Sequence, residues 1–192
     1  INPDDLHAIE AAVCLKESLG GNLTAISMGP LQAVDALSEA MGMGIDKAIL
    51  LSDNAFAGAD TWATSFTLGK AVEKLGEYDL ILCGRQALDG DTAQIGPQVA
   101  DYLQVPQVTY VCEIEETASA HITVRRRLED GYERVRCDLP ALLTVIGELN
   151  SPRYPVMAKL IDACREKSPI TIWNAADIGV KTNQVGLEGA LT

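Results

Sequence analysis

Short apolar runs alternate with amphipathic segments along the first hundred residues. The runs at 23–27, 48–52 and 80–83 are apolar enough for buried strands, and each precedes a segment with apolar residues at helical spacing. These helical positions are Leu31, Val34, Leu37 and Met41, then Phe66, Val72 and Leu75, then Ile95, Val99 and Leu103. Repeated strand and helix units predict a parallel sheet with helices on both faces.

The residues before and after this alternating region also predict particular helices and strands. Asn2 is expected to cap a first helix that begins at Pro3 and ends before Gly20, with acidic residues in its first turn. Beyond a strand at 108–114, alternating residues on either side of Asp130 and Gly131 predict a β-hairpin. Residues 141–147 have the composition of a buried strand, and residues 155–167 that of a helix. The fold class is α/β, an open and mostly parallel sheet with an added hairpin.

Composition narrows the class of protein. The chain has 192 residues, 47% of them hydrophobic, which suits one domain with an extension. A net charge of -12 disfavours nucleic acid and anionic lipid as partners. No apolar run reaches the roughly 18 residues of a membrane span, and no signal peptide opens the text, so a cytoplasmic location is expected. Five scattered cysteines and two histidines do not indicate a metal site.

Ligands of open α/β sheets bind beyond the carboxyl ends of the strands, where three polar loops are expected at 27–30, 53–61 and 84–96. In the third, Gly84 and Gly90 would permit tight turns, amides at the start of the next helix would attract a phosphate, and Arg85 would neutralise it. Asp89 and Asp91 cannot both face that phosphate closely, so at least one is expected to cap backbone amides or accept from a ribose hydroxyl. The alternative is a solvated turn rich in capping residues.

The loop at 53–61 leaves two interpretations open. Asp60 is first of all the N-cap of the helix that follows, while the apolar tip around Phe56 could touch a flat ligand or fold under a lid. Dinucleotide, P-loop and nucleophile-elbow motifs do not occur, and neither histidine has a nucleophile partner. No catalytic side chain is therefore predicted, and a bound cofactor would carry any reaction.

Several motifs together resemble one family. The stretches "INPDDLHAIEAA", "ISMGP", "AMGMGIDKAIL", "CGRQALDGDTAQIGPQVADYL", "PQVTYV" and "LNSPRY" are similar to the beta subunit of electron-transfer flavoprotein, most of all to its electron-bifurcating branch. The resemblance implies an adenine-nucleotide α-hydrolase-like, Rossmann-like domain over residues 1–150. The family's first strand would precede this chain. Residues 151–192 would form a partner-recognition segment and a truncated C-terminal extension.

The resemblance also implies a site. The alpha subunit of a heterodimer would hold one FAD, and this chain would bind a second FAD or AMP. The "FAGADT" loop favours FAD, with Asp60, Thr61 and Thr64 reaching ribityl or phosphate oxygens. Arg85 would tune the flavin from beside its phosphate or ring, or would simply pair with a phosphate. The implied adenine-nucleotide contacts are Asn2, Met28, Asp89, Gly90, Asp91, Thr92, Ala93, Gln94, Ile95 and Gly96.

The implied function is electron transfer. NADH would reduce the flavin of this chain, and electrons would pass to an acyl-CoA-type or related flavin dehydrogenase and to a low-potential acceptor such as ferredoxin or flavodoxin. One alternative is a conventional beta subunit with structural AMP, and another is an ATP-binding stress-type domain that needs no partner. The residues implied in docking the dehydrogenase are Pro152, Arg153, Tyr154 and Met157.

Overall fold

The computed structural model describes residues 1–164 and 170–192, which form two compact units. The first unit contains Ile1 with residues 12–75 and 153–192, and the second contains residues 2–11 and 76–152. In the residues that the structure describes, no helix combines the length and apolar character that crossing a membrane requires.

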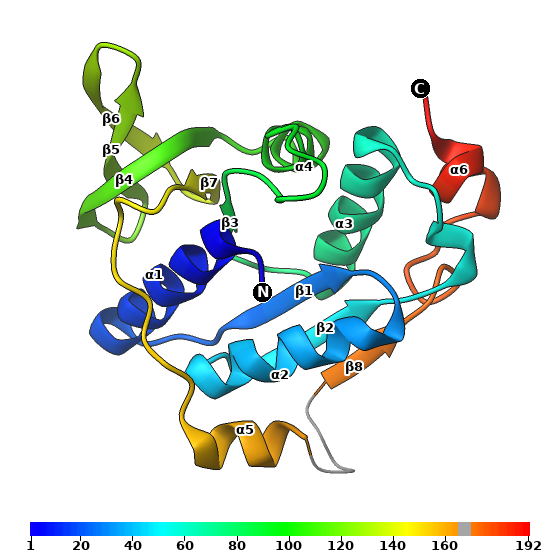
Figure 1. The fold of residues 1–192 in the computed structure, drawn as a ribbon. Helices are drawn as coiled ribbons and strands as arrows, with labels where there is room; N and C mark the ends of the chain where they lie inside the picture. The colour runs from blue at the N-terminus through cyan, green and yellow to red at the C-terminus, as the bar shows by residue number, and fades with distance from the viewer. Residues whose placement is uncertain (165–169) are drawn as a thin grey trace. The chain divides into compact units, whose positions relative to one another are not determined.

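The elements follow the predicted alternation closely (Figure 1). The helices are α1 (Pro3–Leu19), α2 (Val34–Met43), α3 (Thr61–Leu75), α4 (Ile95–Leu103), α5 (Met157–Ala163) and α6 (Gly186–Gly189), with 3-10 turns at Leu31–Ala33, Asn54–Phe56 and Thr182–Gln184. The strands are β1 (Thr24–Met28), β2 (Lys47–Leu51), β3 (Leu80–Gly84), β4 (Gln107–Thr117), β5 (His121–Leu128), β6 (Gly131–Asp138), β7 (Ala141–Val145) and β8 (Ile170–Trp173).

The first unit is built on a three-stranded parallel sheet in the order β1-β2-β8. The central strand β2 is buried on both faces, since four of its five residues are inaccessible to solvent. Figure 1 shows α2 and α3 on opposite sides of this sheet. On the α3 side, Ile49 and Leu51 pack with Phe56 and Ala71 in one apolar cluster.

The second unit is built on a five-stranded sheet in the order β3-β7-β4-β5-β6. The strands β3, β7 and β4 are parallel, and the predicted hairpin of β5 and β6 extends this sheet in antiparallel fashion through β4. All five residues of β7 are buried. Its two faces are covered by different helices, because Leu143 packs with Ala8 of α1 while Leu142 lies beneath Gly96 of α4.

Strand β4 is bulged where it leaves the parallel part of the sheet. Its register with β7 shifts between Val108 and Val111, and Tyr110 within the bulge has φ of 59°. A bulky residue at positive φ is strained, and bulges commonly turn a side chain toward a site. The Tyr110 N–H donates to the Thr144 hydroxyl at 3.2 Å, which holds the bulge against β7. Strand β6 lies at the edge of this sheet.

The C-terminal region departs most from expectation. Residues 170–173, expected inside an extension, form β8 and pair with β2. The helix predicted at 155–167 begins at Met157 and ends at Ala163, and residues 165–167 lie outside the described part of the chain. The predicted α/β class with an open, mostly parallel arrangement is confirmed, although the described strands form two sheets rather than one.

Candidate functional site

The loop between β3 and α4 has a backbone suited to an anion. Ala93 has φ of 53°, and Gln94, the residue before α4, has right-handed helical angles of -101° and -26°. A left-handed residue followed by a right-handed one turns successive N–H groups toward one side, in the arrangement called a nest. The nest adjoins the first turn of a nine-residue helix, whose dipole also favours negative charge.

The residues with a left-handed backbone in this loop are not the glycines that were predicted to have one. Neither Gly84 nor Gly90 has a φ in the left-handed region, whereas Asp91 (φ 48°) and Ala93 do. An alanine held there costs roughly 1–2 kcal/mol, so the surrounding contacts must impose this backbone. The prediction that the backbone angles of Gly84 and Gly90 close these positions to other residues is therefore wrong.

Gly84 and Gly96 lie where any side chain would collide with neighbouring atoms. A Cβ on Gly96 would lie 2.6 Å from Thr144 Cγ2 and 3.1 Å from Cys83 Sγ. A Cβ on Gly84 would lie 2.8 Å from the Asp4 carbonyl carbon. Gly96 thus seats α4 on the sheet, and Gly84 allows the start of α1 to approach the end of β3. A Cβ added at Gly90 would have no atom of the described residues within 4 Å.

The two aspartates of the loop are occupied by short-range hydrogen bonds. Asp89 Oδ1 accepts from the Gly90 N–H at 2.9 Å, and Asp91 Oδ1 accepts from the side-chain amide of Gln86. The prediction that at least one of them caps a backbone amide is confirmed for Asp89. Thr92 and Gln94 are exposed beside them, and Ile95 begins the helix.

Asn2 lies against the same loop. Its carbonyl accepts from Asp5 N–H at 3.0 Å and Leu6 N–H at 3.2 Å, as the N-cap of α1 should. Its side-chain amide donates to the Gln86 carbonyl at 2.9 Å. Asn2 therefore contacts Gln86, at the start of the loop that contains residues 89–96, inside one compact unit.

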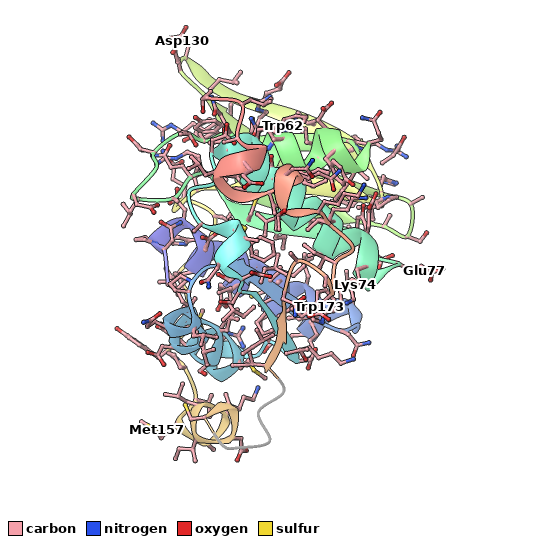
Figure 2. The ribbon with its side chains drawn as sticks, turned by 90° about the vertical axis from the view of Figure 1, so that its right-hand side faces the viewer. Trp62, Lys74, Glu77, Asp130, Met157 and Trp173 are labelled. Atoms are coloured by element: carbon pink, nitrogen blue, oxygen red, sulfur yellow. The ribbon has the colours of Figure 1, made fainter. Side chains whose placement is uncertain are left out.

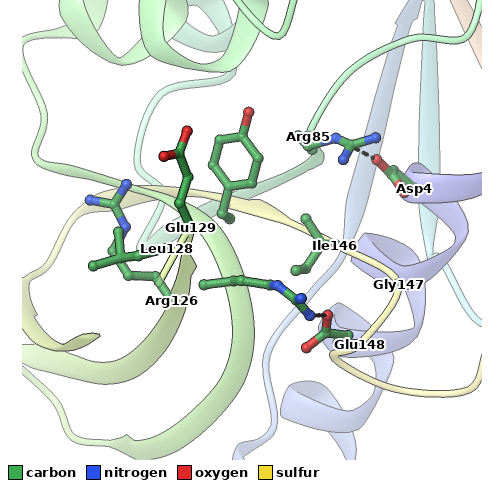
Figure 3. A pocket seen from close by; sticks show the side chains of 10 residues that line it. Asp4, Arg85, Arg126, Leu128, Glu129, Ile146, Gly147 and Glu148 are labelled. Atoms are coloured by element: carbon green, nitrogen blue, oxygen red, sulfur yellow. Dashed lines mark hydrogen bonds and ion pairs between the residues drawn. The ribbon is translucent and has the colours of Figure 1, made fainter. Parts of the chain in front are cut away.

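Arg85 faces an open pocket of about 840 Å³ in the second unit (Figure 3). Its Nε lies 3.4 Å from Asp4 Oδ2, and its guanidinium carbon lies 6.0 Å from the centre of the Tyr110 ring. Arg85 and Arg126 both line this pocket, and within the described residues their Nε atoms are buried without a hydrogen-bond partner. Arg85 therefore places a cation beside this pocket, and Asp4 offsets part of its charge.

The thiol of Cys83, at the end of β3, is unreactive. Burial, and then the nearby Asp5 carboxylate, raise the pKa of Cys83 to about 12. Cys83 is therefore a neutral thiol at physiological pH, and it packs under α4 rather than acting as a nucleophile.

The remaining cofactor residues belong to the first unit. Met28 ends β1 and packs half-buried against the α3-side cluster, and Thr61 and Thr64 lie in the first turn of α3. The structure therefore places Met28, Thr61 and Thr64 within the first unit, and the 89–96 loop belongs to the second.

Asp60 has both carboxylate oxygens engaged. Oδ1 accepts from the Ala63 N–H at 2.9 Å, which confirms the N-cap interpretation. Oδ2 accepts from the Leu191 N–H at 2.8 Å, the Thr192 N–H at 3.2 Å and the Thr192 hydroxyl at 3.0 Å. These bonds, led by the one from Ala63, lower the pKa of Asp60 below its ordinary value. Nothing in the sequence pattern pairs Asp60 with residues this distant.

The apolar tip of the 53–61 loop points inward. The Phe56 ring is buried in the cluster with Ile49 and Leu51, so it is not free to lie along a flat ligand, and that expectation is wrong. The adjacent Ala57 and Gly58 are exposed at the loop surface. Gly58 packs on Leu187, since its built Cβ would lie 3.1 Å from Leu187 Cβ.

Two of the predicted docking residues, Tyr154 and Met157, form an exposed docking surface on the first unit. Tyr154 is 92% exposed and Met157 67% exposed, and Figure 2 shows Met157 projecting from α5. Val156 and Ile161 extend the same surface. Pro152, the other predicted docking residue, is the last residue of the second unit.

Arg153 has a different place. Its guanidinium contacts both carboxylate oxygens of Glu17 in α1, at 2.5 and 3.0 Å, so it anchors the segment rather than pointing away from it. Pro155 packs on Gly42, and the Val156 N–H donates to the Gly42 carbonyl at 2.9 Å. Sequence reasoning missed Glu17 and Gly42, which hold this docking surface in place.

Comparison with known proteins decides the family. A family model described as electron transfer flavoprotein domain matches residues 1–178. The chain belongs to the electron transfer flavoprotein family. Among its relatives, the electron transfer flavoprotein subunit beta of Thermoanaerobacterium thermosaccharolyticum is 53% identical over 192 residues, covering all of this chain and 73% of the relative. The subunit of the same name from Clostridium acetobutylicum is 49% identical, with the same coverage.

A third relative belongs to a named enzyme complex. Subunit CarD of the caffeyl-CoA reductase-Etf complex of Acetobacterium woodii is 49% identical over 193 residues, covering all of this chain and 72% of the relative. The resemblance to electron transfer flavoprotein beta subunits is thus confirmed, and electron transfer is the function of this family.

Proposed function

We propose that this electron transfer flavoprotein chain binds FAD on the 84–96 loop and serves in a heterodimer that oxidises NADH. The observation that carries the proposal is the nest at Ala93 and Gln94 beside the first turn of α4. Convergent N–H groups at a helix start are suited to the phosphates of an adenine cofactor. Asn2 and Arg85, on the same unit, supply an amide and a cation near this loop.

The bound flavin would supply the hydride and single-electron chemistry, which the side chains of this chain do not offer. The protein's part is to hold the nucleotide and to present a surface to the acceptor. Electrons would pass to a flavin dehydrogenase of the acyl-CoA type and, by bifurcation, to ferredoxin or flavodoxin. Relatives named for caffeyl-CoA reductase and acryloyl-CoA reductase complexes support an acyl-CoA-type partner.

The surface around Tyr154 and Met157 is the proposed docking site for that dehydrogenase. An exposed aromatic and a flexible thioether on a short helix are typical anchors of a protein interface. The bonds from Arg153 to Glu17 and from Val156 to Gly42 keep this surface in one conformation before the partner arrives.

A second candidate is AMP as a structural ligand of this chain. It is favoured by Phe56 and Asp60, because a buried ring and a fully bonded carboxylate leave little in the 53–61 loop for a flavin. The nest needs only one phosphate, so it suits AMP equally well.

One measurement separates the candidates. The heterodimer is purified with the alpha subunit, its nucleotides are released by heat, and FAD and AMP are quantified. Two FAD per dimer supports the first proposal, and one FAD with one AMP supports the second. Addition of NADH in the absence of dehydrogenase then tests the redox part, which requires that flavin absorbance near 450 nm falls.

A further inference from the structure

The first turn of α1 and the three residues that follow Cys83 are joined in pairs. Asp5 Oδ1 accepts from the Gly84 N–H at 2.6 Å, Asp4 Oδ2 lies 3.4 Å from Arg85 Nε, and the Asn2 amide donates to the Gln86 carbonyl at 2.9 Å. Two stretches about eighty positions apart therefore run alongside each other, with the acidic turn holding the start of the loop.

The fit at this junction is close. A Cβ on Gly84 would come within 2.8 Å of Asp4 Cβ and of Asp5 N. Only glycine permits this approach, and the short hydrogen bond from Gly84 to Asp5 depends on it. The two acidic residues are therefore more than partners of the helix dipole, because each has a specific atom of the loop within reach.

The contacts continue into the loop. Asp5 Oδ2 accepts from the Asn2 amide at 3.1 Å, so the same carboxylate that holds Gly84 also orients Asn2 toward Gln86. The Gln86 side chain in turn donates to Asp91, the first left-handed residue of the loop. A continuous series of hydrogen bonds thus leads from Asp5 through Asn2 and Gln86 to Asp91.

We infer that Asp5 is a positioning residue for the nucleotide loop. It lies behind the loop and acts through Gly84 and through Asn2 and Gln86, holding Asp91 and the nest that follows it in their left-handed backbone. A loop fixed before binding loses less conformational entropy when the phosphate arrives, which raises affinity. This inference rests on the proposed function, since it concerns the same nucleotide site.

The competing explanation is that Asp5 only balances the positive end of the α1 dipole. Dipole balance would stabilise the helix without changing how the loop binds a ligand. Asp35, an exposed acidic residue in the first turn of α2, offers a matched comparison, because its replacement alters the start of a different helix.

The test uses the heterodimer freed of its nucleotides, with AMP as the probe in titration calorimetry. Asp5→Leu should weaken AMP binding about tenfold or more, because the hydrogen bonds that Asp5 accepts from Gly84 and Asn2 are both lost. Asp5→Asn should weaken it less, since an amide oxygen can still accept from Gly84 while its nitrogen opposes Asn2. Asp35→Asn should change the affinity less than about twofold.

Gln86→Met is a second variant that tests the same series of hydrogen bonds, and it can be measured even if Asp5→Leu does not fold. It should weaken binding by itself, and combined with Asp5→Asn its effect should be less than additive, because both act through one series of bonds. Hydrogen exchange of the amides at 87–94 should be faster in each loop variant of the free protein and unchanged in Asp35→Asn.

The outcomes separate the two ideas. A wild-type dimer that binds neither AMP nor FAD overturns the proposed function. A wild-type dimer that binds AMP, with folded Asp5 variants that bind equally well and exchange at the same rates, overturns the role of Asp5 alone. Full additivity of Asp5→Asn and Gln86→Met also overturns it, because independent effects need no connection between the two residues.

Discussion

Replacement of Gly96 by alanine should disrupt the seating of α4 on the second sheet. The built Cβ lies 2.6 Å from Thr144 Cγ2 and 3.1 Å from Cys83 Sγ, whereas carbon atoms in contact normally stay about 3.5–4.0 Å apart. Thr144 cannot easily withdraw, since it is 2% exposed and lies in the fully buried strand β7. The helix start must therefore move outward by roughly an ångström to restore that contact distance.

The magnitude follows from two opposed effects. Overpacking of a filled core costs about 1–3 kcal/mol, while exchanging glycine for alanine within a helix gains at most about 1 kcal/mol. Subtracting the full helix gain leaves a loss of roughly 0–2 kcal/mol. We expect Gly96→Ala to lower the free energy of unfolding by about 1–2 kcal/mol, the upper half of that range, because Thr144 cannot easily withdraw. AMP binding should weaken as well, because the displaced first turn carries N–H groups of the proposed phosphate site.

Thr144→Ser provides the matched control. It removes the methyl group in the closest contact and keeps the hydroxyl that accepts from Tyr110. Urea unfolding followed by circular dichroism should show that the double variant is more stable than the sum of the single effects predicts, by about 1 kcal/mol. If Gly96→Ala is as stable as the wild type, or if the two single effects simply add, the steric argument is refuted.

Three further predictions concern the docking surface, a thiol and a carboxylate. Gly42→Ala brings a Cβ within 2.9 Å of Pro155 Cβ and should raise the KM for the partner dehydrogenase without changing NADH oxidation by the dimer; an unchanged KM would count against a preformed surface. The pKa of Cys83, raised to about 12, predicts no alkylation by iodoacetamide at pH 8 while the exposed cysteines react. It also predicts that its contribution to stability falls between pH 9 and about 12, because the unfolded chain releases a proton that the folded chain retains. The lowered pKa of Asp60 predicts the opposite pH dependence: its contribution to stability is present at neutral pH and is lost in acid, as the pH falls below the ordinary pKa of an aspartate. Asp60→Asn should also speed amide exchange at Leu191, whose N–H donates to Asp60. An unchanged exchange rate would exclude this hydrogen bond.

Local patterns were sufficient for most of the elements. The helical spacing of Ile95, Val99 and Leu103 and the turn at Asp130 and Gly131 each depend on neighbouring residues, and the structure has α4 and the β5–β6 hairpin there. Strand β8 was missed although its residues, Ile-Thr-Ile-Trp, have the composition of a strand, because a run of four residues does not by itself separate a strand from a helix. Its place beside β2 depends on pairing over about 120 positions, which no local rule reports.

The candidate site shows the same division. The polar loop after β3 follows from the general rule for parallel sheets, and its position and its amides at the start of α4 were predicted. The residues that give the loop its conformation were not, since Asp91 and Ala93 rather than the glycines adopt positive φ. Asp5 reaches Gly84 from about eighty residues away, and a single sequence does not show which distant atoms share a hydrogen bond.

The edge position of β6 has a consequence for the behaviour of the protein in concentrated solution. An outer strand presents backbone groups to which a strand of another molecule could add, which is a common beginning of aggregation. Glu133, Arg134 and Arg136 stand exposed along this strand, and any strand that added here would have to desolvate them. Neutral, β-branched replacements at these three positions would turn the hairpin into a template for fibrils while leaving the interior of the fold untouched.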